Sequence, residues 1–180
     1  DSSRQAALRT AKIDNLLGVG WENANELRKR NPDLMSKKYF AVAPGAIWMR
    51  TDKADTPYSK KDVRRALMMA TDFETIKETY CGGEAQILSW PIVEMKEYKD
   101  AYLPLEEAPA SVQELYVYDP AKAKTLLANA GYPDGFKTSV DCVSTSADYL
   151  AIIKDMWSKV GVDLTIVPYE GSVFNGIVWG

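Results

Sequence analysis

The sequence contains no histidine. Histidine is the only side chain whose unperturbed pKa lies between pH 5 and 8, and it is the commonest metal ligand. Its absence removes the usual base that activates a serine or cysteine nucleophile. Ser36 and Ser59 are each followed directly by two lysines, and neither lies in a Ser-x-x-Lys context typical of a serine–lysine hydrolase. The sequence therefore favours a protein that is not an enzyme and that needs no cofactor or metal.

Cysteine is also scarce, with Cys81 and Cys142 as the only two. In an oxidising compartment these two cysteines could form a disulfide. Alternatively, Cys142 is a small buried residue in a strand and Cys81 is a free thiol near a helix end. The sequence leaves both possibilities open.

No apolar run approaches the roughly 20 residues that span a bilayer. The 22 basic and 25 acidic side chains give a net charge of −3, which argues against a nucleic-acid partner. The only glycine-rich candidate for a phosphate loop, residues 18–20, lacks a third glycine. With 46% hydrophobic and 26% charged residues, the 180-residue chain is typical of one globular domain or one large lobe, residues 1–180.

The clearest pattern covers residues 118–170. Asp119 is a natural N-cap, Pro120 suits the first helical position, and Gly131 suits the end of the helix that they predict. Residues 136–143 have strand character, a second amphipathic helix carries residues 149–160, and residues 162–167 alternate like another strand. This order predicts an α/β fold of three layers, in which a mostly parallel or mixed sheet is flanked by helices.

The preceding residues predict helices and less regular segments. We expect a helix from Ser2 to about Lys12, a strand over residues 15–20 and a helix over residues 21–30. Residues 39–43 and 46–50 are apolar runs that predict a hairpin or one interrupted strand. Ser59 and Asp72 are predicted to cap two further helices, the second reaching Tyr80. Residues 84–117 show no clear period and predict an irregular arm.

Three segments together resemble a known family. Residues 118–136 read Tyr-Asp-Pro-x-x-Ala-x-x-Leu-Leu-x-x-Ala-Gly-Tyr-Pro-Asp-Gly-Phe, and residues 62–72 contain Val-Arg-x-Ala-Leu-x-x-Ala-x-Asp. Residues 7–14 are similar to Ala-Leu-x-x-Gly-x-Ile-Asp, with Ala11 in place of glycine. These motifs resemble family 5 of the extracellular solute-binding proteins of ABC importers, the peptide and nickel type.

The resemblance implies one lobe of a two-lobed periplasmic-binding-protein fold of type II. It implies a small solute as ligand, most often an oligopeptide or dipeptide, together with a second lobe and a membrane permease as partners. It also implies a periplasmic or extracellular location, with a lipoprotein anchor in the full-length parent. Members of the family are much longer, so we expect half a binding pocket here and weak affinity for this part alone.

Two tryptophans are candidate ligand contacts. Trp48 lies between Ile47 and Met49, so in a strand it faces away from both neighbours. Peptide-binding relatives place an aromatic residue in the pocket at a similar position, although an ordinary core tryptophan fits equally well. Trp21 follows Gly18-Val19-Gly20 at a predicted strand-to-helix junction, where α/β proteins commonly bind ligands, but simple helix packing also explains it.

The second group of candidates lies at predicted strand ends. Ser144, Thr145 and Ser146 precede the helix of Tyr149, where hydroxyls and free N–H groups can hold a carboxylate or can simply cap the helix. Tyr169 and Glu170 end the last strand, and the resemblance implies that this turn borders the pocket. Some peptide-binding relatives carry tryptophan at the position of Gly171, and this difference predicts another ligand or a more open site.

Two other functions compete with solute binding. One is a hydrolase, although the sequence offers no nucleophile with a base. The other is a protein-interaction module that uses the irregular arm of residues 84–117. Thermal stabilisation by a solute distinguishes the binding protein from the interaction module, because a ligand that binds only the folded form raises its stability.

Overall fold

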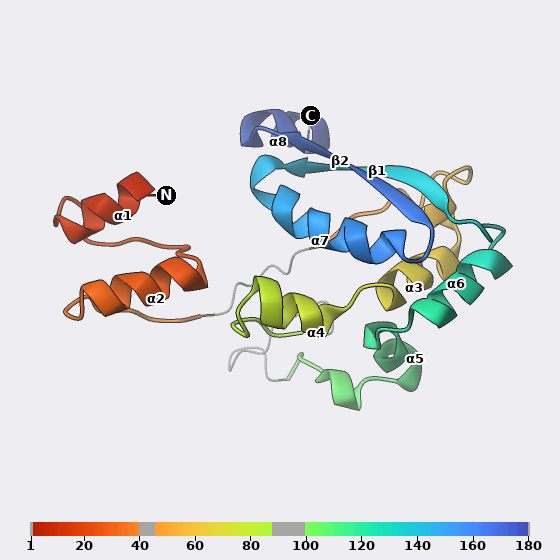
Figure 1. The fold of residues 1–180 in the computed structure, drawn as a ribbon, viewed down its shortest axis with the longest axis horizontal. Coiled ribbons are helices and arrows are strands. Elements are labelled where there is room, and N and C mark those ends of the chain that lie inside the picture. The colour runs from red at the N-terminus through yellow and green to blue at the C-terminus, as the bar shows by residue number, and fades with distance from the viewer. Residues whose placement is uncertain (1, 40–45, 88–99, 180) are drawn as a thin grey trace.

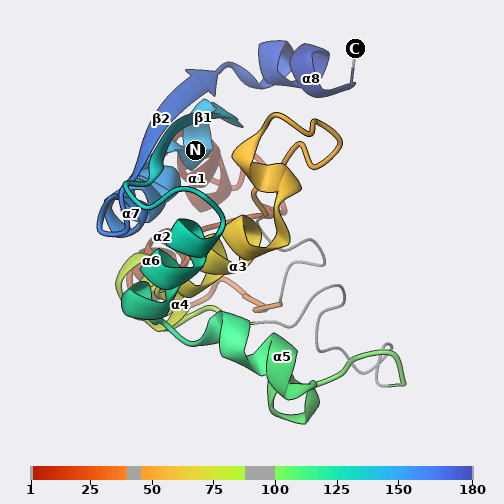
Figure 2. The ribbon, with the colours of Figure 1, turned by 90° about the vertical axis from the view of Figure 1, so that its right-hand side faces the viewer.

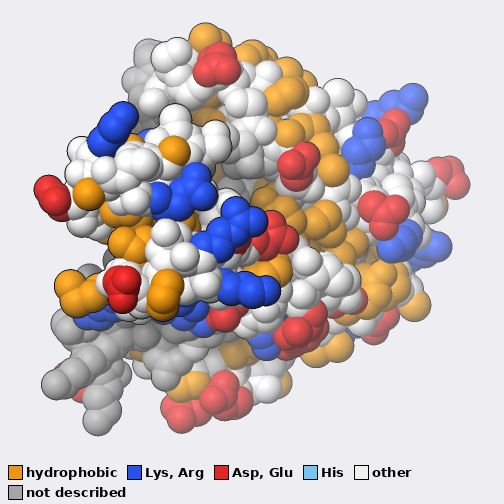
Figure 3. Space-filling view, turned by 60° about the vertical axis from the view of Figure 1, so that its left-hand side comes forward, with side chains coloured by type: hydrophobic (Ala, Val, Ile, Leu, Met, Phe, Trp, Pro, Cys, Tyr) orange, Lys and Arg blue, Asp and Glu red, His pale blue; other side chains and the backbone are white. Residues whose placement is uncertain are grey.

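The computed structural model describes residues 2–39, 46–87 and 100–179. Helices α1 (Ser2–Arg9) and α2 (Trp21–Arg30) lie together on one side, and the remaining elements gather around two strands, β1 (Phe136–Val143) and β2 (Val162–Tyr169) (Figure 1). Neither α1 nor α2 has a buried residue. Apolar and basic side chains both reach the surface on the side of the molecule that carries these two helices (Figure 3).

The two strands pair in parallel, with Phe136 opposite Val162 and Val143 opposite Tyr169. Helix α7 (Ala147–Ser158) connects them, as the predicted strand–helix–strand order requires. The first four residues of β2 alternate between buried and exposed, so in this part of the sheet one face packs on the core and the opposite face is polar and open. The predicted α/β fold with a parallel sheet is confirmed, and this chain supplies helices for one face of that sheet.

The hydrophobic core lies between this sheet face and three helices, α3 (Lys61–Met69), α6 (Pro120–Asn129) and α7. Figure 2 shows α3 and α6 side by side beneath the strands. The core side chains include Val63, Ala66, Leu67, Ala123, Leu127, Ile153, Met156, Trp157, Val162 and Leu164. The indole Nε1 of Trp157 donates a hydrogen bond of 3.0 Å to the buried Thr71 hydroxyl, which donates in turn to the Leu67 carbonyl at 2.8 Å. This relay satisfies the polar atoms that Trp157 and Thr71 bring into the core.

Helix α6 begins and ends as the sequence predicts. The carboxylate of Asp119 accepts the Lys122 backbone N–H at 2.8 Å, and Pro120 occupies the first helical position. At the other end, Gly131 has a φ of +91°, and the N–H of Tyr132 reaches back to the Leu127 carbonyl at 2.8 Å. This is the Schellman arrangement, in which a left-handed glycine lets the chain satisfy the last helical carbonyls.

Replacing Asp119 with alanine is expected to lower the free energy of unfolding by about 0.5–2 kcal/mol, the usual cost of losing an N-cap. The measurement is equilibrium denaturation followed by circular dichroism. Asp33→Ala is the matched control, because Asp33 is an exposed turn residue and its loss should change stability by less than about 0.5 kcal/mol. Equal stabilities for the two variants would show that the cap does not stabilise α6.

Short elements complete the described chain. They are η1 (Pro57–Ser59), α4 (Phe73–Thr75), the π-helical turn η2 (Ile76–Tyr80), η4 (Leu105–Glu107), α5 (Ala110–Gln113), η5 (Glu114–Tyr116), η6 (Ser144–Ser146) and α8 (Gly171–Trp179). Asp72 caps α4 as predicted, with its carboxylate accepting the Thr75 N–H at 2.9 Å. Within the described parts of residues 84–117, only short helical turns occur, and residues 88–99 lie outside the described residues.

Several local predictions are wrong. Residues 15–20 and 46–50 form no strand, because an apolar run becomes a strand only when a neighbouring strand accepts its backbone hydrogen bonds. Most of the other apolar run, residues 40–43, lies outside the described residues. Lys60, not Ser59, is the residue at the N-cap of α3, and Ser59 instead belongs to η1. Helix α8 was not predicted, because Gly171 and Gly176 lower its intrinsic helix propensity.

Two further observations concern the cysteines and the length of the helices. Cys81 and Cys142 are both free thiols, and Cys142 is buried in β1. None of the helices in residues 2–39, 46–87 and 100–179 is long and apolar enough to cross a bilayer.

Candidate functional site

The carboxyl ends of the two parallel strands bring together two of the predicted segments. Val143 at the end of β1 lies opposite Tyr169 at the end of β2, so Ser144 and Glu170 leave the sheet at the same edge. In α/β proteins this edge is where ligands usually bind. The structure therefore places the hydroxyl-rich turn η6 next to the turn that opens α8.

The hydroxyls of η6 are not used to cap a helix. Neither η6 nor α7 receives a side-chain capping hydrogen bond, although Ser146 occupies the N-cap position of α7. Ser144 and Thr145 are exposed and Ser146 is partly exposed. The turn offers hydroxyls beside the partly positive N-terminus of a twelve-residue helix, whose first turn also carries the acidic Asp148.

Tyr169 lies on the open face of the sheet near the same edge. Partial burial raises the pKa of its phenol, and the charge and hydrogen bond of neighbouring Asp141 raise that pKa further. The phenol is therefore neutral near pH 7, and with its O–H donated to Asp141 its oxygen can still accept a hydrogen bond.

A second group of predicted residues gathers around Tyr80, which the sequence reasoning missed. The rings of Tyr80 and Tyr149 lie 5.5 Å apart between centroids, and the indole Nε1 of Trp21 donates to the Tyr80 carbonyl oxygen at 3.3 Å. We call Trp21, Tyr80 and Tyr149 the aromatic cluster. Its only sequence indication was the position of Tyr80 directly before Cys81 and two glycines, at the end of a predicted helix.

Two ionisable groups at the aromatic cluster have raised pKa values. Burial raises the pKa of the Tyr149 phenol, with smaller contributions from Cys81 and Tyr80. Burial also raises the pKa of the Cys81 thiol. A thiol with a raised pKa is a poor nucleophile near neutral pH, so this cluster suits contact with a ligand better than covalent chemistry.

Trp48 is 82% exposed, whereas its neighbours Ile47 and Met49 pack against the core. Its side chain thus faces away from both neighbours, as predicted, even though residues 46–50 form no strand. Trp48 is not an ordinary core tryptophan, and its contact with a solute stays a prediction.

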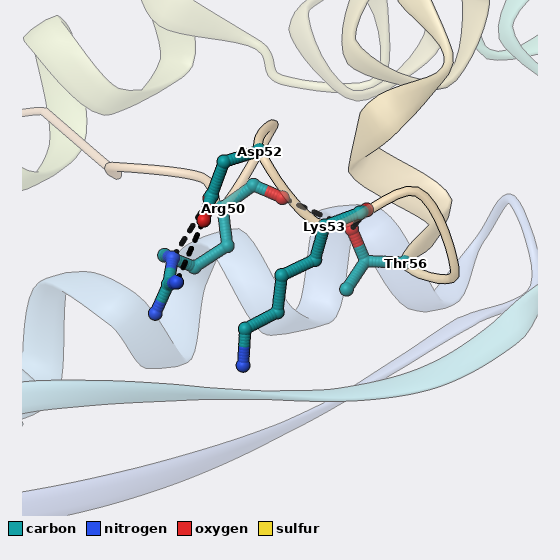
Figure 4. A network of polar contacts seen from close by, with 4 residues as sticks. All are labelled: Arg50, Asp52, Lys53 and Thr56. Carbon is teal, nitrogen blue, oxygen red and sulfur yellow. Dashed lines mark hydrogen bonds and ion pairs between the residues drawn. The ribbon is translucent and has the colours of Figure 1, made fainter.

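The loop that follows Trp48 is fixed by a small polar network (Figure 4). The guanidinium of Arg50 donates two hydrogen bonds to the Asp52 carboxylate, at 2.8 and 2.7 Å. The Thr56 hydroxyl bridges the carbonyls of Arg50 and Lys53, at 3.0 and 2.9 Å. These contacts link residues 50–56 to one another immediately after Trp48. The Arg50 hydrogen bond also lowers the pKa of Asp52 to about 2.

The lowered pKa of Asp52 predicts a specific dependence on pH. Because the folded-state pKa lies below the ordinary value of 3.8, the ion pair contributes fully above about pH 4, and its contribution is lost as the pH falls through about 2. Arg50→Gln should return the pKa of Asp52 toward 3.8, as measured by NMR titration of the carboxyl carbon. The control Arg28→Gln should leave it near 2. A titration of Asp52 near 3.8 in the unaltered protein would contradict the network.

The described residues, 2–39, 46–87 and 100–179, hold no group of three or more His, Cys, Asp or Glu side chains placed to bind a metal ion. The candidates that lie at the carboxyl edge of the sheet carry hydroxyl, phenol and carboxylate groups. In open α/β sheets, small molecules commonly bind at this edge.

The chain belongs to the bacterial extracellular solute-binding proteins of family 5, whose middle-region family model matches residues 1–178. It is 32% identical over 181 residues to heme-binding protein A of Haemophilus influenzae, covering 94% of this chain and 30% of that protein. It is 25% identical over 175 residues to a glutathione-binding protein of Pectobacterium atrosepticum, covering 94% and 31%. The chain thus spans about 30% of the length of these relatives.

Solved structures have the same fold. The periplasmic binding protein DppA from Helicobacter pylori, in complex with the peptide STSA, matches with a TM-score of 0.74 at 27% identity, over 96% of this chain and 31% of that one. A dipeptide-binding protein from a Pseudoalteromonas species, in complex with Met-Leu, matches with a TM-score of 0.75 at 25% identity, over 98% and 34%. The predicted type II periplasmic-binding-protein fold is confirmed, and this chain is a fragment of it.

Proposed function

We propose that this chain is part of the substrate-binding component of an ABC importer, which captures a peptide or a related small solute and performs no covalent chemistry. The observation that carries this proposal is the likeness of nearly the whole chain to two proteins solved with bound peptides. The family is one of extracellular proteins. A periplasmic or extracellular location, a lipoprotein anchor in the full-length protein and a membrane permease as partner are parts of the same proposal.

Such a protein functions by binding its solute more tightly in one conformation than in another. The solute stabilises a closed form over an open one, to the extent that it contacts the closed form better. Half of those contacts come from a second lobe, supplied by the rest of a longer polypeptide. The apolar side chains of Val173, Ile177 and Val178 on α8, which are about half exposed here, support such a partner.

The candidate residues take distinct roles in this proposal. The hydroxyls of Ser144, Thr145 and Ser146, together with the N-terminus of α7, hold a carboxylate of the solute. Tyr169 and Glu170 border the same edge and offer one neutral and one charged oxygen.

The aromatic candidates contact the less polar parts of the solute. Trp48 is the most exposed of them, and Trp21 and Tyr149 approach the solute from the aromatic cluster. Broad specificity follows if the backbone and termini of a peptide carry most of the affinity while its side chains occupy loose, hydrated pockets.

Thermal unfolding of the full-length polypeptide tests this function. A solute at 100 times its dissociation constant should add about 2.7 kcal/mol to the free energy of unfolding. The probes are dipeptides, tetrapeptides and heme, the last because a heme-binding relative is 32% identical. Free amino acids are the control, since they carry the same termini without a peptide bond. Stabilisation by peptides supports the proposal. Stabilisation by heme alone would mean that the solute is heme and not a peptide. If no probe stabilises the protein, the proposed function is contradicted.

A further inference from the structure

The aromatic cluster is built by three separate segments. Trp21 begins α2, Tyr80 ends η2, and Tyr149 lies in the first turn of α7. Tyr80 contacts both of the others, through its ring to Tyr149 and through its carbonyl oxygen to the indole N–H of Trp21. Tyr80 is therefore the residue that joins the two predicted candidates into one surface.

Gly82 sets the position of the Trp21 ring. A Cβ atom at Gly82 would lie only 2.6–2.7 Å from three carbons of the indole, so the ring packs directly on the glycine backbone. Gly82 also has a φ of +58°, which side chains rarely adopt. The backbone at Gly82 therefore leaves room for the flat indole ring of Trp21.

The cluster keeps aromatic surface open to solvent. Tyr80 is 40% exposed, and Trp21 and Tyr149 are partly exposed. Aromatic residues that serve only the core bury most of their large area. The rings of Phe73 and Tyr116, which are also partly exposed, pack 5.5 Å apart elsewhere in the chain and provide a comparison pair.

The cluster lies near the turn that we propose holds a carboxylate. Tyr149 follows Ser146 by three residues, so the two residues are about one helical turn apart at the start of α7. A carboxylate bound at this helix N-terminus is therefore about one turn from Tyr149, whose ring lies against that of Tyr80.

We propose that Tyr80, supported by Trp21 and Tyr149, forms one wall of a subsite for an aromatic side chain of the solute. The preferred solutes are accordingly peptides that carry an aromatic residue. Ring pairs stack edge to face or offset, and each such pair adds affinity beyond the area that it buries. This inference rests on the proposed function and deepens it, because it names the chemical class that the site selects.

The test compares the affinities of two dipeptides, Ala-Phe and Ala-Ala, for the full-length protein by isothermal titration calorimetry. Tyr80→Ala should weaken Ala-Phe binding about three- to tenfold more than it weakens Ala-Ala binding. Tyr80→Phe keeps the ring and should retain the preference. Tyr116→Ala is the matched control, because it removes a tyrosine from the comparison pair and should not alter the ratio of the two affinities.

A second variant tests the cluster without removing any of its rings. Gly82→Ala displaces the Trp21 indole and should reduce the Ala-Phe preference in a protein that circular dichroism shows to be folded. Binding of both dipeptides with a ratio unchanged by Tyr80→Ala overturns the inference and leaves the proposed function standing. Failure of the unaltered protein to bind either dipeptide or any other peptide overturns both.

Discussion

Replacing Gly135 with alanine is expected to destabilise the fold by about 2–6 kcal/mol, the sum of a strained backbone and an overpacked contact. Gly135 has a φ of +79°, and a Cβ atom there would overlap the carbonyl of Gly161 and lie 2.8 Å from its Cα. Gly161 has a φ of +87° itself, and its own Cβ would lie 3.0 Å from the Asp134 carbonyl oxygen. The two backbones touch where the chain enters β1 and β2, so neither can move without shifting a strand.

Equilibrium denaturation in urea measures this effect, and Gly176→Ala is the matched control. Gly176 lies within α8, and a Cβ atom there would meet no other atom within 4 Å, so alanine should stabilise the helix by up to about 1 kcal/mol. One unfavourable φ alone costs about 1 kcal/mol. If Gly135→Ala lowers the free energy of unfolding by less than this, the backbones of Gly135 and Gly161 do not approach each other closely.

Replacing Leu67 with alanine is expected to lower the free energy of unfolding by about 2–5 kcal/mol. Leu67 on α3 is 1% exposed and lies in the core with side chains from α6, α7 and β2. Truncation removes apolar contacts from this core and leaves a cavity that a close-packed interior fills only in part. The Thr71 hydroxyl bonds to the backbone carbonyl of Leu67, so the variant tests apolar packing and keeps that hydrogen bond.

Leu17→Ala provides the comparison for this experiment. Leu17 is 62% exposed, so the same change of side chain should alter the stability by no more than about 0.5 kcal/mol. The difference between the two variants isolates the effect of burial. Similar losses for both would mean that the core is not centred on α3.

The two halves of the chain differ in how far their structure follows from the sequence. Helix α6, β1, α7 and β2 were predicted in order because each has its own local determinants, such as the Asp119 cap, the Gly131 turn and the alternation within the strands. Residues 15–20 and 46–50 were predicted wrongly because an apolar run does not reveal whether a pairing strand exists. The register that sets Val143 opposite Tyr169 also required the structure.

The candidate site shows the same division. The sequence indicated the types of residue that would bind a solute, namely hydroxyls before a helix, a tryptophan in an apolar run and a tryptophan at a strand-to-helix junction. The contacts of these residues with a solute remain predictions. It gave no reason to join Trp21 with Tyr149, which lie far apart along the chain. Tyr80 makes that connection, and nothing in its local pattern distinguishes it from any other tyrosine at a helix end.

The amino-acid sequence by itself determined the helices and strands of residues 118–170, the absence of histidine chemistry and the likeness to a family of solute-binding proteins. The tertiary structure alone decided which face of the sheet is covered, which strand ends meet and which rings touch. Caps, turns and periodicity act over a few neighbouring residues, so the sequence displays them directly. Contacts between distant segments depend on how the whole core packs, and only the folded chain brings those segments together.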